Sequence, residues 1–210
     1  MPTPPPQSPT ASAWAAARRG GERRGTGDPV DVHLVPLRRR HLRSVTRIES
    51  QVYPRPWSLT LFLSELNLRA SRYYVAARVD GAVVGYAGLM FVGDEGHVTN
   101  IAVDPAWQRH QIGTRLLLQL AAAARARPTP EAPRRARHLT LEVRVSNVAA
   151  QEMYKKFGFN PAGIRKNYYV ESREDALVMW AYDIDTDAYG TRLGAIARNV
   201  AGATVVDPGT

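Results

Sequence analysis

Hydrophobic and polar positions along the chain follow two different periods, which divide it into strands and helices. Short apolar runs and alternating patterns predict strands over residues 31–37, 73–79, 82–92, 97–103, 138–145, 160–169 and 176–184. Apolar residues spaced three and four apart predict helices over 38–51, after an N-cap at Ser58, and over 112–126 and 147–157. The order of these elements, β-α-α-β-β-β-α-β-α-β-β, predicts one α/β (α+β) domain built on a mixed sheet.

The two ends of the chain lack this strong patterning. Residues 1–30 are rich in proline, alanine, glycine, serine, threonine and arginine, a composition that predicts a disordered tail. Residues 185–210 carry weak helical spacing around Leu193 and Ile196, so we expect a flexible or weakly helical extension there. The folded domain is therefore predicted to span residues 31–184.

A formal net charge of +9 over 210 residues raises the question of an anionic partner. Nucleic acid, the ribosome or an anionic cofactor would each suit this charge, whereas solvated basic tails and loops would need no partner. We favour the solvated interpretation because arginines cluster in the opening tail and around a proline-bearing loop, at positions 18, 19, 23, 24, 125, 127, 134, 135 and 137. Neither cluster alternates with aromatic residues, so we do not expect nucleic acid binding.

The absence of cysteine narrows the chemistry that the chain can perform. It excludes disulfides, thiolate metal sites and a cysteinyl acyl-enzyme, and we expect no metal. No apolar run approaches the roughly 20 residues that span a bilayer, and no secretory signal pattern opens the chain. We therefore expect a cytoplasmic protein without a membrane partner.

The segment from Asn100 to Thr114 predicts a strand that ends, a short loop, and a helix that begins. A helix N-terminus presents unpaired backbone N–H groups and a partial positive charge, which suit a pyrophosphate. Gly113 removes side-chain bulk where phosphates would approach the backbone, and Arg109 and Arg115 would add positive charge nearby. The alternative interpretation is an ordinary helix start with no ligand.

This segment resembles the cofactor loop of the GNAT acetyltransferases, whose pattern is Q/R-x-x-G-x-G/A. Gln108 fills its first position and Gly113 its last, whereas Gln111 stands where the family has its first glycine. The resemblance implies that acetyl-CoA binds here. It places the pantetheine arm and acetyl group beside the backbone of Ile101, Ala102 and Val103, and the pyrophosphate beside Arg109, His110, Gln111, Ile112, Gly113 and Thr114. The Cβ of Gln111 would be costly at positive φ, but its amide could bond a phosphate oxygen.

A second informative segment, LEVRVSNVAAQEMY, runs from residue 141 to 154. Strand alternation places Glu142 on the opposite face from its apolar neighbours, and Asn147 opens the next helix. Tyr154 follows two helical turns later on the same helical face. A carboxylate, an amide and a phenol can thus converge at the junction of strand and helix. Taken singly, they could equally be a surface ion pair, a helix cap and a core tyrosine.

Together these residues resemble the LEVRxSNxxAxxLY block of the bacterial ribosomal-protein-alanine N-acetyltransferases (RimI type). Met153 replaces the leucine of that block. The resemblance implies that Glu142 is the general base, Tyr154 the general acid and Asn147 a cofactor contact. These roles suit acetyl transfer to an amine, because the amine must lose a proton and the departing thiolate must gain one.

Two further segments carry the same resemblance on the acceptor side. Arg165-Lys166-Asn167-Tyr168-Tyr169, followed by Glu174-Asp175-Ala176, is similar to the R-x-x-Y-Y…E-D-A signature of RimI-type and related N-terminal acetyltransferases. In that group, the tyrosines corresponding to Tyr168 and Tyr169 lie on a hairpin over the acceptor groove. Pro56 and Trp57 belong to a segment that resembles the family's F-P-W-S loop, which lines the same groove, with Arg55 in place of its phenylalanine.

The resemblance implies a GNAT fold, with a mixed, strongly twisted sheet flanked by helices. We expect the sheet to splay where strand 97–103 meets strand 138–145, with acetyl-CoA in the opening. The implied function is acetyl transfer to a protein N-terminal α-amine, on alanine of a small-subunit ribosomal protein. Two alternatives stay open: acetylation of lysine or a small-molecule amine, and a degenerate GNAT that acts as a binding module. A nucleic-acid-binding module is least favoured.

Overall fold

The computed structural model describes residues 29–126 and 136–207 of the chain. The predicted tail, apart from its last two residues, lies outside this part, and so does most of the arginine-rich loop around residue 130. Val30, assigned to the tail by composition, is buried in the core. The folded region therefore begins slightly earlier than the sequence pattern indicates.

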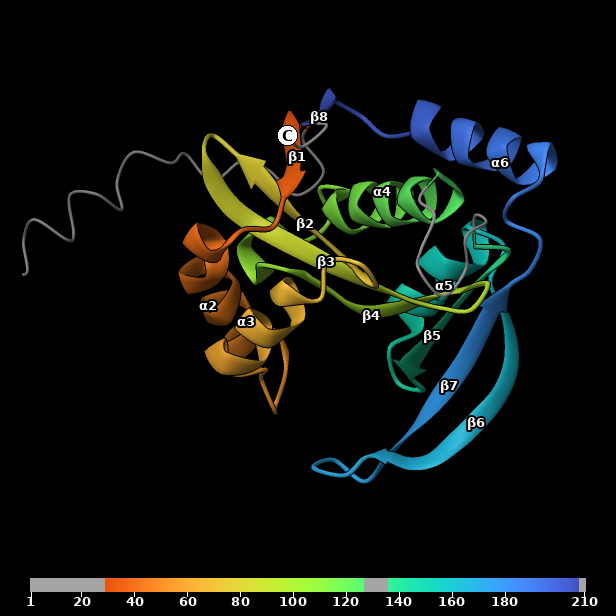
Figure 1. The fold of residues 1–210 in the computed structure, drawn as a ribbon, viewed down its shortest axis with the longest axis horizontal. Coiled ribbons are helices and arrows are strands. Elements are labelled where there is room, and N and C mark those ends of the chain that lie inside the picture. Colours follow the sequence, from red (N-terminus) through yellow and green to blue (C-terminus); the bar gives the residue numbers. More distant parts are fainter. Residues whose placement is uncertain (1–28, 127–135, 208–210) are drawn as a thin grey trace, which may run out of the picture.

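One mixed sheet of eight strands organises these residues, in the order β6-β7-β5-β4-β3-β2-β1-β8 (Figure 1). Its strands are β1 (Val32–Pro36), β2 (Arg72–Val79), β3 (Ala82–Val92), β4 (Glu95–Val103), β5 (His138–Arg144), β6 (Asn160–Tyr169), β7 (Glu174–Ala181) and β8 (Thr204–Val206). The β4–β5 and β1–β8 pairs are parallel, and the other neighbours are antiparallel. The predicted mixed sheet is confirmed.

Helices cover the two faces of this sheet in separate groups. Helices α2 (Leu42–Val52) and α3 (Leu59–Asn67) pack on one face, after a short 3₁₀ turn η1 (Arg39–His41), and α4 (Ile112–Ala126) packs on the other. Helix α5 (Val148–Lys156) joins the core on the α4 side. The two apolar cores lie between the sheet and these helix groups, one on each face.

Helix α4 carries the predicted cofactor segment and is held close to the sheet. Its buried face includes Ile112, Leu116 and Leu120, which recur every four residues. Burying each such side chain contributes roughly 1.5–3 kcal/mol. Gly85 of β3 permits the approach, because a Cβ there would lie 2.9 Å from the Ala102 carbonyl and 3.2 Å from Ile112 Cγ2. The start of α4 is thereby fixed against the end of β4.

The sheet splays between β4 and β5. These strands pair through Glu95, Gly96 and His97 alone, which lie opposite residues 138–140. Beyond this point β4 continues to pair with β3, and β5 continues to pair with β7. The edges of β4 and β5 that face each other therefore separate toward their C-terminal ends. The predicted position of the opening is confirmed.

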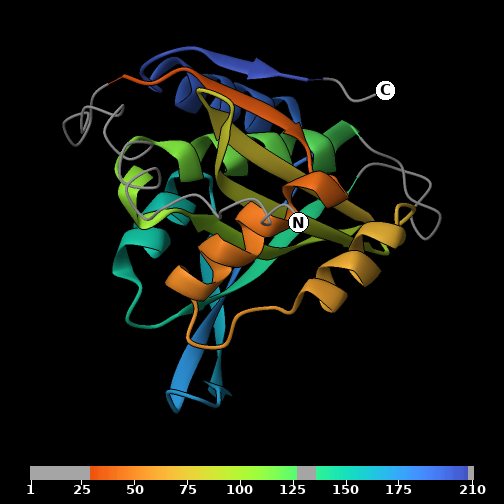
Figure 2. The same ribbon diagram turned by 90° about the vertical axis from the view of Figure 1, so that its left-hand side faces the viewer.

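The C-terminal extension contains more structure than its weak pattern predicts. Asp187–Arg198 forms helix α6, which lies beside α4, and Thr204–Val206 forms β8. Figure 2 shows β8 running beside β1 at the edge of the sheet, an arrangement that the sequence analysis missed. A three-residue strand has too few positions to show an alternating pattern, and its partner lies about 170 residues away in the chain. None of the helices in the described part is long and apolar enough to cross a membrane.

Candidate active site

The loop between β4 and α4 turns through two residues with left-handed backbone. Asp104 caps a short 3₁₀ turn, η2 (Pro105–Trp107), by accepting a hydrogen bond from the Ala106 N–H at 3.0 Å. Arg109 and Gln111 then have φ values of 70° and 58°. This region costs a residue with a Cβ roughly 1–2 kcal/mol, whereas glycine adopts it readily. The glycine of the family pattern at position 111 thus has a conformational reason, and Gln111 bears that cost.

The side chain of Gln111 contacts the C-terminal extension. Its Nε2 donates to the Asn199 carbonyl at 3.3 Å, and its Oε1 accepts from the Ala201 N–H at 2.9 Å. The proposed contact between this amide and a phosphate oxygen would therefore compete with two internal hydrogen bonds. The glutamine ties the cofactor loop to the segment that follows α6.

Arg115 does not supply charge to the loop as the sequence suggested. It is buried, and its guanidinium donates to the carbonyls of Val30, Ala201 and Ala203 and to the Thr204 hydroxyl. Burial lowers the pKa of Arg115, and nearby Asp31 opposes this shift. The arginine is one turn into α4, where its side chain faces β8 rather than the solvent. It therefore holds the two ends of the described chain together.

A pocket of about 330 Å³ lies between the start of α4 and helix α5. Six of the predicted cofactor residues line it: Val103, Arg109, Gln111, Ile112, Gly113 and Thr114. Its other walls come from the loop before α4, from α5 and from α6, through Trp107, Gln108, Ala149, Glu152, Met153, Lys156, Phe157 and Ile196. Lys156 and the α6 residue Ile196 were not anticipated, because they lie outside the cofactor motif.

Four predicted cofactor residues do not line this pocket. Ala102 and His110 are buried, and the His110 ring lies 5.9 Å from that of Trp107. Asn147 caps α5 by accepting from the Ala150 N–H at 3.2 Å, as the ordinary interpretation of that residue expects. The Ile101 carbonyl accepts a hydrogen bond from the Tyr53 hydroxyl at 3.0 Å.

The predicted general base, Glu142, is half-buried on β5. Its carboxylate pairs with Arg165 of β6 at 3.0 Å, rather than with its strand neighbour Arg144. Arg144 instead bridges Glu171 and Glu174 at 2.7 and 3.0 Å. Glu142 therefore faces the hairpin formed by β6 and β7, with an ion-pair partner that the local sequence does not reveal.

The predicted general acid, Tyr154, lies in α5 with its ring 5.8 Å from that of Phe159. Burial raises the pKa of Tyr154, and nearby Tyr169 adds to the shift. Burial also raises the pKa of Tyr53, which lies in the loop after α2, and the charges of Tyr154, Glu49 and Tyr169 add to the shift. Sequence analysis missed this third tyrosine.

Hairpin β6–β7 carries the two predicted acceptor tyrosines. The rings of Tyr168 and Tyr169 are 5.2 Å apart and perpendicular, and the Tyr169 hydroxyl lies 3.5 Å from the Glu142 carbonyl oxygen. The Arg144 guanidinium stacks 3.8 Å above the Tyr169 ring. The hairpin thus brings Tyr169 to the strand that carries the predicted base, while Tyr168 stays exposed beside Arg165.

The loop that carries Pro56 and Trp57 is anchored by a buried carboxylate that the motifs did not indicate. Glu49 of α2 accepts the Trp57 N–H at 2.8 Å and a hydrogen bond from the Tyr86 hydroxyl. Burial raises the pKa of Glu49 to about 7, and the Trp57 N–H partly opposes this. Trp57 packs on Phe62, whereas Pro56 is exposed. The spacing of apolar residues could not single out Glu49, because a glutamate in an amphipathic helix is expected on its exposed, polar face.

Comparison with known proteins identifies the class to which this fold and site belong. Residues 42–159 match the family model described as the acetyltransferase (GNAT) family. The chain belongs to this family.

Particular relatives share most of the domain. The chain is 36% identical over 140 residues to the ribosomal protein bS18-alanine N-acetyltransferase of Escherichia coli K12, covering 66% of this chain and 88% of that protein. It is 36% identical over 160 residues to the N-alpha-acetyltransferase RimI of Mycobacterium tuberculosis, covering 73% and 94%. The crystal structure of the Escherichia coli ribosomal-protein-S18-alanine N-acetyltransferase matches with a TM-score of 0.63 at 34% identity, over 72% of this chain and 94% of that one.

Proposed function

We propose that this protein transfers the acetyl group of acetyl-CoA to the N-terminal α-amine of a protein. The proposed acceptor is the N-terminal alanine of a small-subunit ribosomal protein, as in the names of its relatives. Such an acceptor would place the reaction in the cytoplasm. The observation that carries the proposal is the opening between β4 and β5, because the pocket at the start of α4 begins at the end of β4 and Glu142, with Tyr169 against its backbone, lies on β5.

The pocket at the start of α4 suits the pyrophosphate of acetyl-CoA. Arg109 and Lys156 line it, and the helix N-terminus contributes a partial positive charge. A Cβ added at Gly113 would lie 3.6 Å from Met153 Sδ and 3.9 Å from Val103 Cγ2, which are ordinary contacts. The fold itself would therefore accept a side chain at residue 113, so close approach of a ligand is the better reason for glycine.

Acetyl-CoA, when bound, supplies a thioester carbonyl that is open to attack by an amine. Glu142 would take a proton from the attacking amine, directly or through a water molecule, as the C–N bond forms. Tyr154 would give its proton to the departing sulfur as the C–S bond breaks. The phenol carries this proton at neutral pH, because its ordinary pKa is about 10 and burial raises it further. Holding amine and thioester together in the splay supplies much of the acceleration.

The acceptor side favours an α-amine over a lysine side chain. A protein α-amine has a reference pKa near 7.7–8.0, against about 10.4 for lysine, so a carboxylate working through solvent suffices. Tyr168, Tyr169 and the Trp57 loop would hold the first residues of the peptide. The ion pair between Glu142 and Arg165 would have to open or rearrange as the amine arrives.

Peptides that differ in their first residue, incubated with the enzyme and acetyl-CoA, would test this function by mass spectrometry. We expect acetyl on the α-amine of an alanine-first peptide, and none on a peptide with a blocked N-terminus and an internal lysine. Transfer to lysine or to a small amine instead would favour the second enzymatic alternative. Binding of acetyl-CoA without any transfer would favour a degenerate GNAT.

A further inference from the structure

A second cavity, of about 720 Å³, lies away from the proposed active site. It is formed by the end of β1 and the η1 turn, the last turn of α3 and the start of β2. It shares no lining residue with the cofactor pocket, which is built from the end of β4 and from helices α4, α5 and α6.

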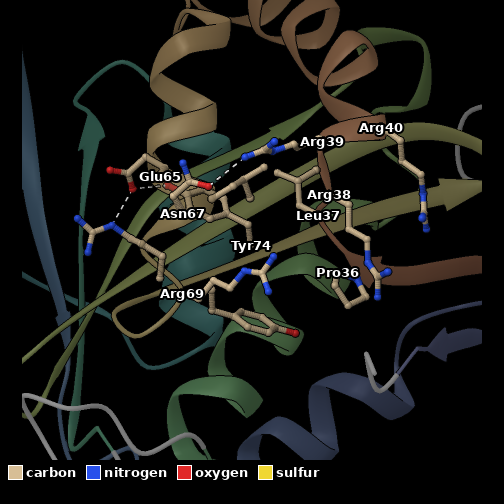
Figure 3. A pocket seen from close by; sticks show the side chains of 12 residues that line it. Pro36, Leu37, Arg38, Arg39, Arg40, Glu65, Asn67, Arg69 and Tyr74 are labelled. Atoms are coloured by element: carbon tan, nitrogen blue, oxygen red, sulfur yellow. Dashed lines mark hydrogen bonds and ion pairs between the residues drawn. The ribbon is translucent and has the colours of Figure 1, made fainter.

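The lining of this cavity is strongly basic. It carries five arginines against a single carboxylate, at positions 38, 39, 40, 69 and 72, and we refer to it as the arginine pocket. The carboxylate of Glu65 accepts from Arg72 Nε at 2.7 Å and from the Tyr74 hydroxyl at 2.9 Å, so it is engaged at one wall. Figure 3 shows Arg39 reaching Asn67, with which it bonds at 3.3 Å, while Arg38 and Arg69 extend toward Pro36.

The side chains of Arg38, Arg39, Arg40 and Arg69 are exposed, so an anion can reach these like charges directly from solvent. The planar fork of arginine matches the oxygens of a phosphate group in a bidentate fashion. The helix end at this site is the C-terminus of α3. The helix dipole places a partial negative charge there, which does not stabilise a bound anion. Recognition would therefore rest on the arginines. A volume of 720 Å³ falls within the range of small-molecule sites, roughly 300–1,000 Å³.

We propose that the arginine pocket binds a small anion with two or more phosphate groups, of the inorganic polyphosphate or nucleoside polyphosphate class. Two adjacent phosphates offer oxygens to arginines on both sides of the cavity, from the η1 turn and from the loop after α3. The site is separate from the proposed acetyl-CoA pocket and does not depend on the proposed function. Binding of a ligand there would tie the η1 turn to the loop after α3.

Calorimetry on the full chain saturated with acetyl-CoA would test this site, because the cofactor pocket is then closed to competing phosphates. The probes are inorganic pyrophosphate and ATP, with sulfate as a single-centre anion. We expect pyrophosphate and ATP to bind at least 10-fold more tightly than sulfate. We expect ATP to exceed pyrophosphate if the source is a nucleotide, and to equal it if the phosphates alone are recognised.

Replacing Arg38 and Arg69 by glutamine should weaken pyrophosphate binding at least 10-fold. Arg43→Gln serves as the matched control, since Arg43 is exposed on α2 and outside the lining, and it should leave the affinity within twofold. Arg69→Glu provides a second, single variant that should abolish binding while thermal melting shows a folded protein. Equal affinity for sulfate and pyrophosphate, or equal weakening by Arg43→Gln, would show that binding depends only on the overall positive charge. Either result would overturn the proposal. Tighter binding of a short single-stranded RNA, lost in the same variants, would replace the proposal with a nucleic acid surface.

Discussion

Glu142 and Tyr154 differ in how the surrounding protein holds them. Glu142 is in part exposed and paired with Arg165, whereas Tyr154 is buried with a raised pKa. If they act as base and acid, Glu142→Gln and Tyr154→Phe should each lower kcat by about 100- to 10,000-fold while leaving acetyl-CoA affinity unchanged. Steady-state kinetics and calorimetry would check both expectations.

A matched control for the tyrosine exists in α6. The hydroxyl of Tyr189 is also buried, and it has no hydrogen-bond partner among the described residues. Burial raises its pKa as well. Tyr189→Phe should therefore keep the full kcat. Full activity in both Glu142→Gln and Tyr154→Phe would show that neither residue has the assigned role.

The buried carboxylate of Glu49 should make stability depend on pH. Its pKa is raised from 4.5 to about 7, so the folded protein keeps a proton that the unfolded chain has released. Stability should therefore fall as pH rises from about 4.5 to 7, by about 2 kcal/mol after allowance for solvent access. Glu49→Gln should remove this decline, as urea unfolding at pH 5 and pH 7 would show. The exposed Glu152→Gln should retain it, and an identical decline in all three proteins would contradict the prediction.

At the scale of elements, the C-terminal extension is fastened to the first turn of α4. Gln111 binds the segment after α6, and Arg115 binds the residues around β8. Ile196 of α6 also lines the cofactor pocket. The extension therefore belongs to the structure that surrounds the proposed pyrophosphate site.

Gln111→Gly and Gln111→Ala would separate the cost of the positive φ at residue 111 from the contribution of its side-chain hydrogen bonds. Both lose the two hydrogen bonds to Asn199 and Ala201, but glycine also relieves the positive φ. We expect the alanine variant to be about 1 kcal/mol less stable than the glycine variant. In both variants, hydrogen exchange at the Ala201 amide should be faster. Acetyl-CoA affinity should be unchanged or better with glycine, by at most about 1 kcal/mol. A marked loss of affinity with glycine would make the side chain a ligand contact.

Hairpin β6–β7 should act on the peptide rather than on the cofactor. Tyr169→Ala removes the ring that packs under Arg144 and reaches the Glu142 backbone, so the peptide KM should rise at least 5-fold with acetyl-CoA binding intact. Tyr182→Ala, at an exposed tyrosine just after β7, is the control and should leave KM unchanged. A selective loss of acetyl-CoA binding in the Tyr169 variant would contradict this assignment.

At the scale of the whole molecule, the opening tail should be dispensable for catalysis. Residues 1–27 have the composition of a solvated chain and lie outside all the motifs. A chain that begins at Asp28 keeps Val30, whose carbonyl binds Arg115, and should melt at the same temperature as the full chain. Its kcat on an isolated peptide should stay within twofold. A large fall in kcat would mean that the tail contributes to the site.

Local features of the sequence were enough to predict most elements and the class of the protein. Helix α4 and the β2–β3 hairpin follow from spacings and turn residues that act over a few positions, so their boundaries fall within two residues of the structure. The 141–154 segment and the acceptor signature also bring Glu142 and Tyr169 into one region, through their positions on β5 and on the β6–β7 hairpin.

The tertiary structure decided which partners these residues have. Glu142 pairs with Arg165 rather than Arg144, Arg115 faces β8 rather than a ligand, and Gln111 binds the extension. Each choice depends on packing between segments that lie far apart in the chain, which no local period encodes. The same reason explains why β8 escaped prediction: three residues become a strand because β1 offers them an open edge.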